Sequence, residues 1–116
     1  MKYLKRFNES SNSGIENICQ EYGITNYTIN DDGSIDVAGG VDLRGKNLKQ
    51  LPLTFRKVDG YFSCNDNQLT TLVGGPESVG GNFYCSENQL TTLVGIRPYI
   101  KGDLFCENNP LESLEG

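Results

Sequence analysis

The sequence predicts a repeat solenoid, in which similar coils stack on one another and their short strands form a parallel β-sheet. The main observation is a period of 21 residues, which separates Cys64, Cys85 and Cys106 and also separates Asn67, Asn88 and Asn109. Around each cysteine, apolar and polar residues alternate, as expected for a strand with one face turned inward. A single coil cannot bury its own apolar face, so the copies must stack to form a core.

The repeated unit occurs in four copies, which begin at Gly39, Gly60, Gly81 and Gly102. Its core reads Phe/Leu-x-Cys-x-x-Asn-x-Leu and resembles the leucine-rich repeat, L-x-L-x-x-N-x-L. The resemblance covers roughly residues 38–116, and the short period is similar to that of the bacterial subclass. This resemblance implies an extended convex side. It also implies that each Asn bonds to the backbone of its own turn and of the next coil. The first copy departs from the pattern, because Lys46 stands where the Asn belongs.

The residues before the repeats predict a polar N-terminal tail, residues 1–12, and a cap, residues 13–37. Ser13-Gly14-Ile15-Glu16 has the form of a capping box, which predicts a helix over residues 14–22 that is ended by Gly23 in a left-handed conformation. Within the tail, a short docked helical turn remains an alternative. Two β-type runs around Asp31-Asp32-Gly33 predict a hairpin over residues 27–37. One face of the helix carries apolar residues at helical spacing: Ile15, Ile18, Cys19 and Tyr22.

The composition argues against several classes of function. The 116 residues fit one domain, and 15 acidic against 10 basic residues give a net charge of −5. Such a chain repels phosphate backbones, so we expect no nucleic-acid partner. No run approaches the roughly 18 apolar residues of a membrane span. The first residues also lack the apolar core of a secretory signal, which leads us to expect a cytoplasmic protein without a membrane partner. The chain contains no His, the commonest general base.

The layout as a whole resembles small repeat proteins encoded by bacteriophages. The resemblance rests on the opening Met-Lys-Tyr-Leu-Lys-x-Phe, the following cap, and repeats rich in Cys and Asn. It implies a location in the cytoplasm of the host cell, and it implies no defined activity.

The four cysteines are predicted to be core residues rather than ligands. Cys64, Cys85 and Cys106 occupy the inward column where leucine stands in the related repeats, and a buried free Cys packs as a small hydrophobic residue. A ladder of thiols on stacked strands does not supply the tetrahedral geometry that zinc prefers. We therefore expect no metal, no other cofactor and no catalytic residue. The paired carboxylates Asp31 and Asp32 are interpreted as part of the hairpin turn.

The candidate binding surface is the outward face of the strand ladder. Alternation places large aromatic side chains there on successive coils, beside charged residues, and buried aromatic anchors with a polar rim are typical of interface hot spots. The same aromatics could instead stabilise cross-strand pairs. The partner-binding residues that we predict are Tyr61, Tyr84, Phe105, Arg44, Asp103 and Glu107.

These features favour a non-enzymatic module that binds a protein through its concave sheet. A phage origin would make a host or virion protein the partner. The acidic residues Asp103 and Glu107 predict a partner with a basic face. The alternative is a structural protein that self-associates through its last coil, because we see no polar cap after the final repeat and an open strand edge invites pairing.

Overall fold

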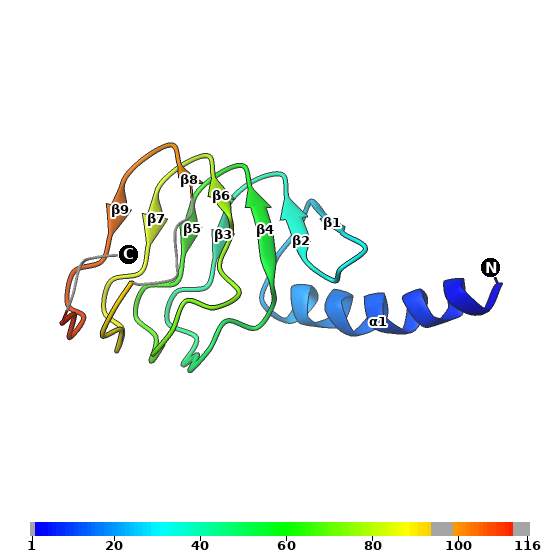
Figure 1. Cartoon of the computed structure of the whole chain (residues 1–116), viewed down its shortest axis with the longest axis horizontal. Coiled ribbons are helices and arrows are strands. Elements are labelled where there is room, and N and C mark those ends of the chain that lie inside the picture. The colour runs from blue at the N-terminus through cyan, green and yellow to red at the C-terminus, as the bar shows by residue number, and fades with distance from the viewer. Residues whose placement is uncertain (1, 94–98, 113–116) are drawn as a thin grey trace.

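The computed structural model describes residues 2–93 and 99–112, and it confirms a repeat solenoid behind an N-terminal helix (Figure 1). From one end to the other, the coils follow one another along the long axis of the molecule. In the described residues, no helix has the length and apolar character needed to cross a membrane. The elements are α1 (Lys2–Glu21), β1 (Tyr27–Ile29), β2 (Ile35–Val37), β3 (Val41–Asp42), β4 (Phe55–Val58), β5 (Phe62–Ser63), β6 (Ser78–Val79), β7 (Phe83–Tyr84), β8 (Tyr99–Ile100) and β9 (Leu104–Phe105).

Each coil contributes one strand to each of two sheets. Sheet A has the order β1-β2-β4-β6-β8, and sheet B has the order β3-β5-β7-β9. The pairing in sheet B is parallel and in constant register, with Val41 opposite Phe62, Phe62 opposite Phe83, and Phe83 opposite Leu104. The described part of the solenoid therefore makes about three turns with a 21-residue spacing. The stretches 94–98 and 113–116 of the predicted repeats lie outside the described residues.

The core fills the space between the two sheets. Phe55, Phe62 and Phe83 are all buried and pack ring against ring, with centroids 5.1 Å apart for the first pair and 5.2 Å for the second. Leu69 and Leu90, from the turns after sheet B, are completely buried beside them. The alternation in the sequence thus places the apolar side chains in the core. The side chains between them lie on the outer face of sheet B.

The N-terminal cap has the predicted helix face and hairpin. Cys19 is completely buried, and Ile15, Ile18 and Tyr22 pack against the core. Gly23 has a φ of 70°, as predicted for the left-handed residue that ends a helix. Strand β1 pairs antiparallel with β2 around the Asp-Asp-Gly turn. The hairpin is continuous with the solenoid, because β2 also pairs in parallel with β4.

The start of the helix differs from the prediction. Helix α1 begins at Lys2 rather than near residue 14, so the segment 2–12 is helical and not an irregular tail. The helix does not begin at the capping box of Ser13, because the segment before it can also form a helix. That segment contains Leu4, Lys5 and Arg6, which are good helix formers, and it contains no proline. Figure 1 shows that the first half of α1 extends beyond the sheets.

Candidate functional site

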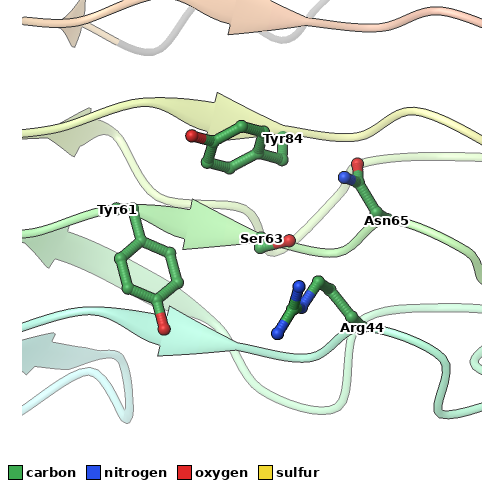
Figure 2. A pocket seen from close by; sticks show the side chains of 5 residues that line it. All are labelled: Arg44, Tyr61, Ser63, Asn65 and Tyr84. Carbon is green, nitrogen blue, oxygen red and sulfur yellow. The ribbon is translucent and has the colours of Figure 1, made fainter.

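The outer face of sheet B contains a hollow of about 360 Å³. Its lining residues come from three neighbouring coils (Figure 2): Arg44, Tyr61, Ser63, Asn65 and Tyr84. Ser63 and Tyr84 are the second residues of β5 and β7, whereas Arg44 and Asn65 lie just beyond the ends of β3 and β5. We call this hollow the Ser63 pocket, because the serine lies at the centre of the group in Figure 2.

The three aromatic residues predicted on this face do not form one continuous strip. Tyr84 and Phe105 stack with ring centroids 5.1 Å apart and an interplanar angle of 9°. Tyr61 turns towards the preceding coil, where its ring covers Gly40 so closely that an added Cβ would lie 2.4 Å from a ring carbon. The face therefore presents a two-ring stack on β7 and β9 and a separate, 43% exposed tyrosine beside the pocket.

Tyr84 is held by a polar contact in addition to its stack. Asn82, two residues earlier, donates a hydrogen bond of 2.9 Å from its Nδ2 to the hydroxyl oxygen of Tyr84. The Oδ1 of the same asparagine accepts a hydrogen bond of 2.8 Å from the backbone N–H of Asp103. Asn82 thus ties the orientation of Tyr84 to the next coil, so the ring has a fixed place on the face.

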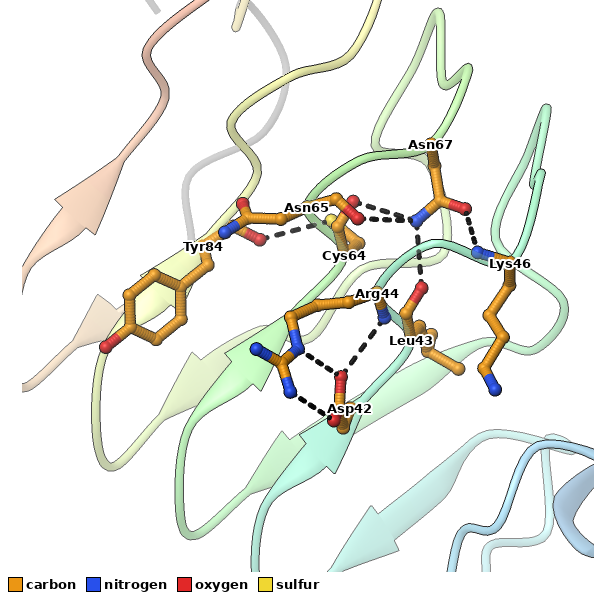
Figure 3. Close-up of polar contacts among 8 residues, drawn as sticks. All are labelled: Asp42, Leu43, Arg44, Lys46, Cys64, Asn65, Asn67 and Tyr84. Atoms are coloured by element: carbon orange, nitrogen blue, oxygen red, sulfur yellow. Dashed lines mark hydrogen bonds and ion pairs between the residues drawn. The ribbon is translucent and has the colours of Figure 1, made fainter.

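Arg44 forms an ion pair with Asp42 of the same coil. Its Nε lies 2.9 Å from Oδ1 of Asp42, and its Nη2 lies 3.0 Å from Oδ2 (Figure 3). These hydrogen bonds hold the pKa of Asp42 below its ordinary value and raise the pKa of Arg44. Both side chains are well exposed, so the pair contributes little to stability. Its effect is local: it places a guanidinium in the lining of the pocket, whereas Asp42 lies outside the lining.

A ladder of asparagines holds the turns that follow sheet B and so positions Arg44 and Asn65. The Oδ1 of Asn67 accepts hydrogen bonds from the backbone N–H groups of Lys46 and Leu48, at 3.0 and 2.9 Å. Its Nδ2 donates to the carbonyl oxygen of Leu43 at 2.8 Å (Figure 3). These partners belong to the coil before Asn67, and not to the coil after it as the resemblance implied. An asparagine in the first repeat would have no earlier repeat to hold, which explains why Lys46 is tolerated there.

The two acidic residues of the predicted binding surface lie on the last described coil. Asp103 and Glu107 are both exposed. One carboxylate oxygen of Glu107 accepts a hydrogen bond of 2.6 Å from the hydroxyl of Ser86, and this bond lowers the pKa of Glu107. Glu107 therefore remains charged near neutral pH, and both acidic side chains lie beside the Tyr84–Phe105 stack.

Two of the three repeat cysteines are buried in the core, and the third is only partly covered. Cys64 and Cys85 are completely buried, and burial raises the pKa of both thiols, that of Cys85 to about 12. Such thiols stay protonated at neutral pH and are poor nucleophiles. Cys106 is only half-buried, because no further described coil covers it. In the part of the chain that the structure describes, no group of three His, Cys, Asp or Glu side chains is arranged to hold a metal ion.

The structure brings together only part of the predicted surface. Arg44, Tyr61 and Tyr84 share the Ser63 pocket, whereas Phe105 joins them only through its stack on Tyr84. Sequence reasoning missed Ser63, Asn65 and Asn82. A signal for Ser63 does exist in the sequence, since it is the one small residue in a column that otherwise contains Asp42, Tyr84 and Phe105.

Comparisons with known proteins give no relative from which a function could be transferred. No family model matches the chain, no curated protein matches it, and no solved structure matches it.

Proposed function

We propose that this protein is a non-enzymatic binding module that engages a partner protein through the outer face of sheet B. The observation that carries the proposal is the stack of Tyr84 and Phe105, two large rings fixed on adjacent rigid strands and only partly buried. Rigid aromatic side chains lose little conformational entropy on binding and are enriched among the residues that dominate interface energies. The adjoining Ser63 pocket gives the same face a concave feature with polar groups.

The charged residues at the two ends of this face favour a partner that carries both basic and acidic groups. Asp103 and Glu107 border the aromatic stack and favour basic residues opposite them, which would mainly raise the rate of association. Arg44 lies at the other end of the face, beside Tyr61. A partner whose charges complement both ends would be held in one orientation along the strands of sheet B.

We further propose that the coils are leucine-rich repeats of the short bacterial or bacteriophage type, acting in the cytoplasm. This proposal is supported by inward leucines at Leu69 and Leu90 and by asparagines that bond to the backbone of an adjacent coil. A phage-encoded protein of this kind would act on a host or virion protein. The buried, protonated thiols of Cys64 and Cys85 support binding rather than thiol-based catalysis.

The double change Tyr84→Ala and Phe105→Ala is expected to weaken partner binding by at least about thirtyfold, because removal of interface anchors typically costs 2 kcal/mol or more. Wild-type protein and the double variant would be used in parallel to capture proteins from the native organism. The affinity of any protein retained only by the wild type would then be measured by calorimetry.

The matched control is Tyr99→Ala, which removes a 71% exposed aromatic side chain from sheet A. It should leave both capture and affinity unchanged. If the double variant binds like the wild type but unfolds at a much lower temperature, the stack is a structural cross-strand pair and the proposed function is wrong.

A second candidate function is self-association through the last described coil. Leu104 occupies the inward column of sheet B, yet it is 44% exposed, and strands β8 and β9 are the final strands of their sheets among the described residues. An exposed apolar residue next to unpaired strand edges favours contact with a second copy. In light scattering after size exclusion, this function predicts a mass that increases with concentration, and Leu104→Glu should abolish the increase. A constant monomer mass would exclude it.

A further inference from the structure

We propose that the Ser63 pocket receives the carboxylate of an acidic side chain of the partner protein. This inference rests on the proposed use of the sheet B face, and it adds the chemical group that the pocket recognises. Three observations lead to it: a buried hydroxyl without a partner, a surplus of hydrogen-bond donors around it, and a guanidinium in the lining.

The first observation is the state of the Ser63 hydroxyl. Ser63 is only 2% exposed, and its Oγ has no hydrogen-bond partner among the described residues. Leaving a buried hydroxyl unpaired costs about 1–3 kcal/mol, and buried polar side-chain atoms are normally satisfied. An alanine would occupy this position without that cost. The hydroxyl therefore indicates a group that reaches it only in the bound state.

The second observation is that the acceptor atoms near the pocket are already used. The Oδ1 of Asn65 accepts a hydrogen bond of 2.7 Å from the backbone N–H of Ser86. Both carboxylate oxygens of Asp42 accept from Arg44. The Tyr84 hydroxyl oxygen accepts from Asn82, so its own proton is left to donate. What the pocket can still offer is mostly donors, and these require acceptor oxygens from the ligand.

The donors that remain come from several sides of the pocket. The printed bonds of Arg44 use its Nε and Nη2, and that of Asn65 uses its Oδ1, so among the described residues the Nη1 of Arg44 and the Nδ2 of Asn65 are left to donate. The hydroxyl groups of Ser63 and Tyr61, which also line the pocket, can each donate. A carboxylate presents two oxygens with about four lone-pair positions, which matches several donors at once. A neutral carbonyl presents one oxygen and satisfies fewer of them.

The third observation is the local charge. Arg44 lines the pocket and Asp42 does not, although the two form an ion pair. The positive end of that pair therefore faces the ligand, and hydrogen bonds from an ionised donor to a carboxylate are about twice as strong as neutral ones. Asp103 and Glu107 lie at the opposite end of the ladder, on the last described coil.

The lining of the pocket can adjust to such a group. The side chain of Arg44 is 62% exposed, so its guanidinium can turn from Asp42 towards a bound carboxylate at little cost. A hollow of about 360 Å³ is within the range of small-ligand sites and accepts the end of an acidic side chain.

The inference can be tested on the isolated protein with sodium acetate as the carboxylate probe. Acetamide and methylammonium chloride serve as neutral and cationic probes, at constant ionic strength and pH. Two-dimensional NMR would follow the side-chain signals of Asn65 and Arg44 and the backbone amides around Ser63. We expect saturable shifts with acetate, and an affinity for acetate at least about tenfold higher than for acetamide or methylammonium, as one additional charge-assisted bond would give.

The decisive variant is Ser63→Ala. We expect it to weaken acetate binding about fivefold or more and to leave the melting temperature unchanged or higher, because an unpaired buried hydroxyl is removed. Ser78→Ala in sheet A is the matched control and should leave acetate binding unchanged. Equal shifts with acetamide, the absence of saturable acetate shifts, or unchanged acetate binding by Ser63→Ala would each overturn the carboxylate assignment.

This result is independent of the test of the proposed function. Acetate binding requires no partner protein, so its failure removes only the assignment of the pocket. Unchanged partner binding by the Tyr84 and Phe105 double variant would instead contradict the proposed function, whatever the outcome with acetate.

Discussion

Replacing Asn88 by alanine is expected to lower the free energy of unfolding by about 3 kcal/mol, at the upper end of the cost of leaving buried groups unpaired. Asn88 is 2% exposed, and among the described residues its side chain bonds to backbone groups alone. Its Oδ1 accepts from the N–H of Leu69 at 3.0 Å, and its Nδ2 donates to the carbonyl of Cys64 at 3.0 Å and to that of Cys85 at 3.2 Å. Alanine strands these groups in the core, and water cannot replace the lost partner.

Urea denaturation of the wild type, Asn88→Ala and Gln89→Ala would measure the effect. Gln89 follows directly in the sequence and is exposed, so its replacement should change the free energy of unfolding by less than about 0.5 kcal/mol. Asn88→Asp should be at least as damaging as alanine at neutral pH, because it turns a carboxylate oxygen towards carbonyl oxygens. Equal stability of Asn88→Ala and the wild type would show that Asn88 is not buried.

Gly60→Ala is expected to destabilise the protein by about 2–3 kcal/mol, the cost of overpacking a rigid site. Gly60 stands at the corner between β4 and β5, where the coils approach closely. A Cβ there would lie 2.9 Å from the carbonyl carbon of Gly39 and 2.9 Å from the nitrogen of Gly40. Neither coil can move away easily, because the N–H of Gly60 donates to Gly39 at 2.9 Å and its carbonyl accepts from Gly81 at 3.0 Å.

The matched control is Gly14→Ala, which should raise the stability of the protein, whereas Gly60→Ala lowers it. Gly14 lies within α1 and is exposed, and apart from the adjoining helix backbone no described atom lies within 4 Å of the position that a Cβ would take. Alanine there is expected to stabilise the helix by about 0.5–1 kcal/mol. Thermal unfolding of both variants would check this. A Gly60→Ala protein as stable as the wild type would mean that the coils are spaced more widely than the structure shows.

The sequence alone was sufficient to predict the solenoid, because the same local pattern recurs with each coil. Phe62 and Phe83 occupy equivalent places in successive copies, so one inference about burial applied to all copies. The hairpin and the cap at Gly23 were predicted for a similar reason, since both depend on a few adjacent residues. The predicted start of the helix was wrong. A capping box favours the start of a helix at that residue, but it does not prevent the segment before it from being helical as well.

The turns after sheet B share a left-handed backbone conformation at one position. The residue directly before each ladder asparagine has a positive φ of about 60°, although glycine would adopt this conformation more easily. These residues are Asp66, Glu87 and Asn108, with φ of 60°, 59° and 60°. Three of the four residues in this column, Gly45, Asp66 and Asn108, are of types that tolerate a positive φ, so the sequence does carry a signal for it. Glu87 is the exception, and its turn is held by backbone hydrogen bonds to the neighbouring coils.

The period, the inward columns and the ladder of asparagines were thus determined by the sequence, whereas the candidate site was decided by the tertiary structure. Alternation showed which residues point outward, but it did not show that Tyr61 turns over Gly40 while Tyr84 stacks on Phe105. Ser63 stands in the same outward column as Tyr84 and Phe105, yet the structure buries it. The physical reason is distance along the chain: the rotamer of an outward side chain depends on residues one coil away, which are 21 positions distant in the sequence.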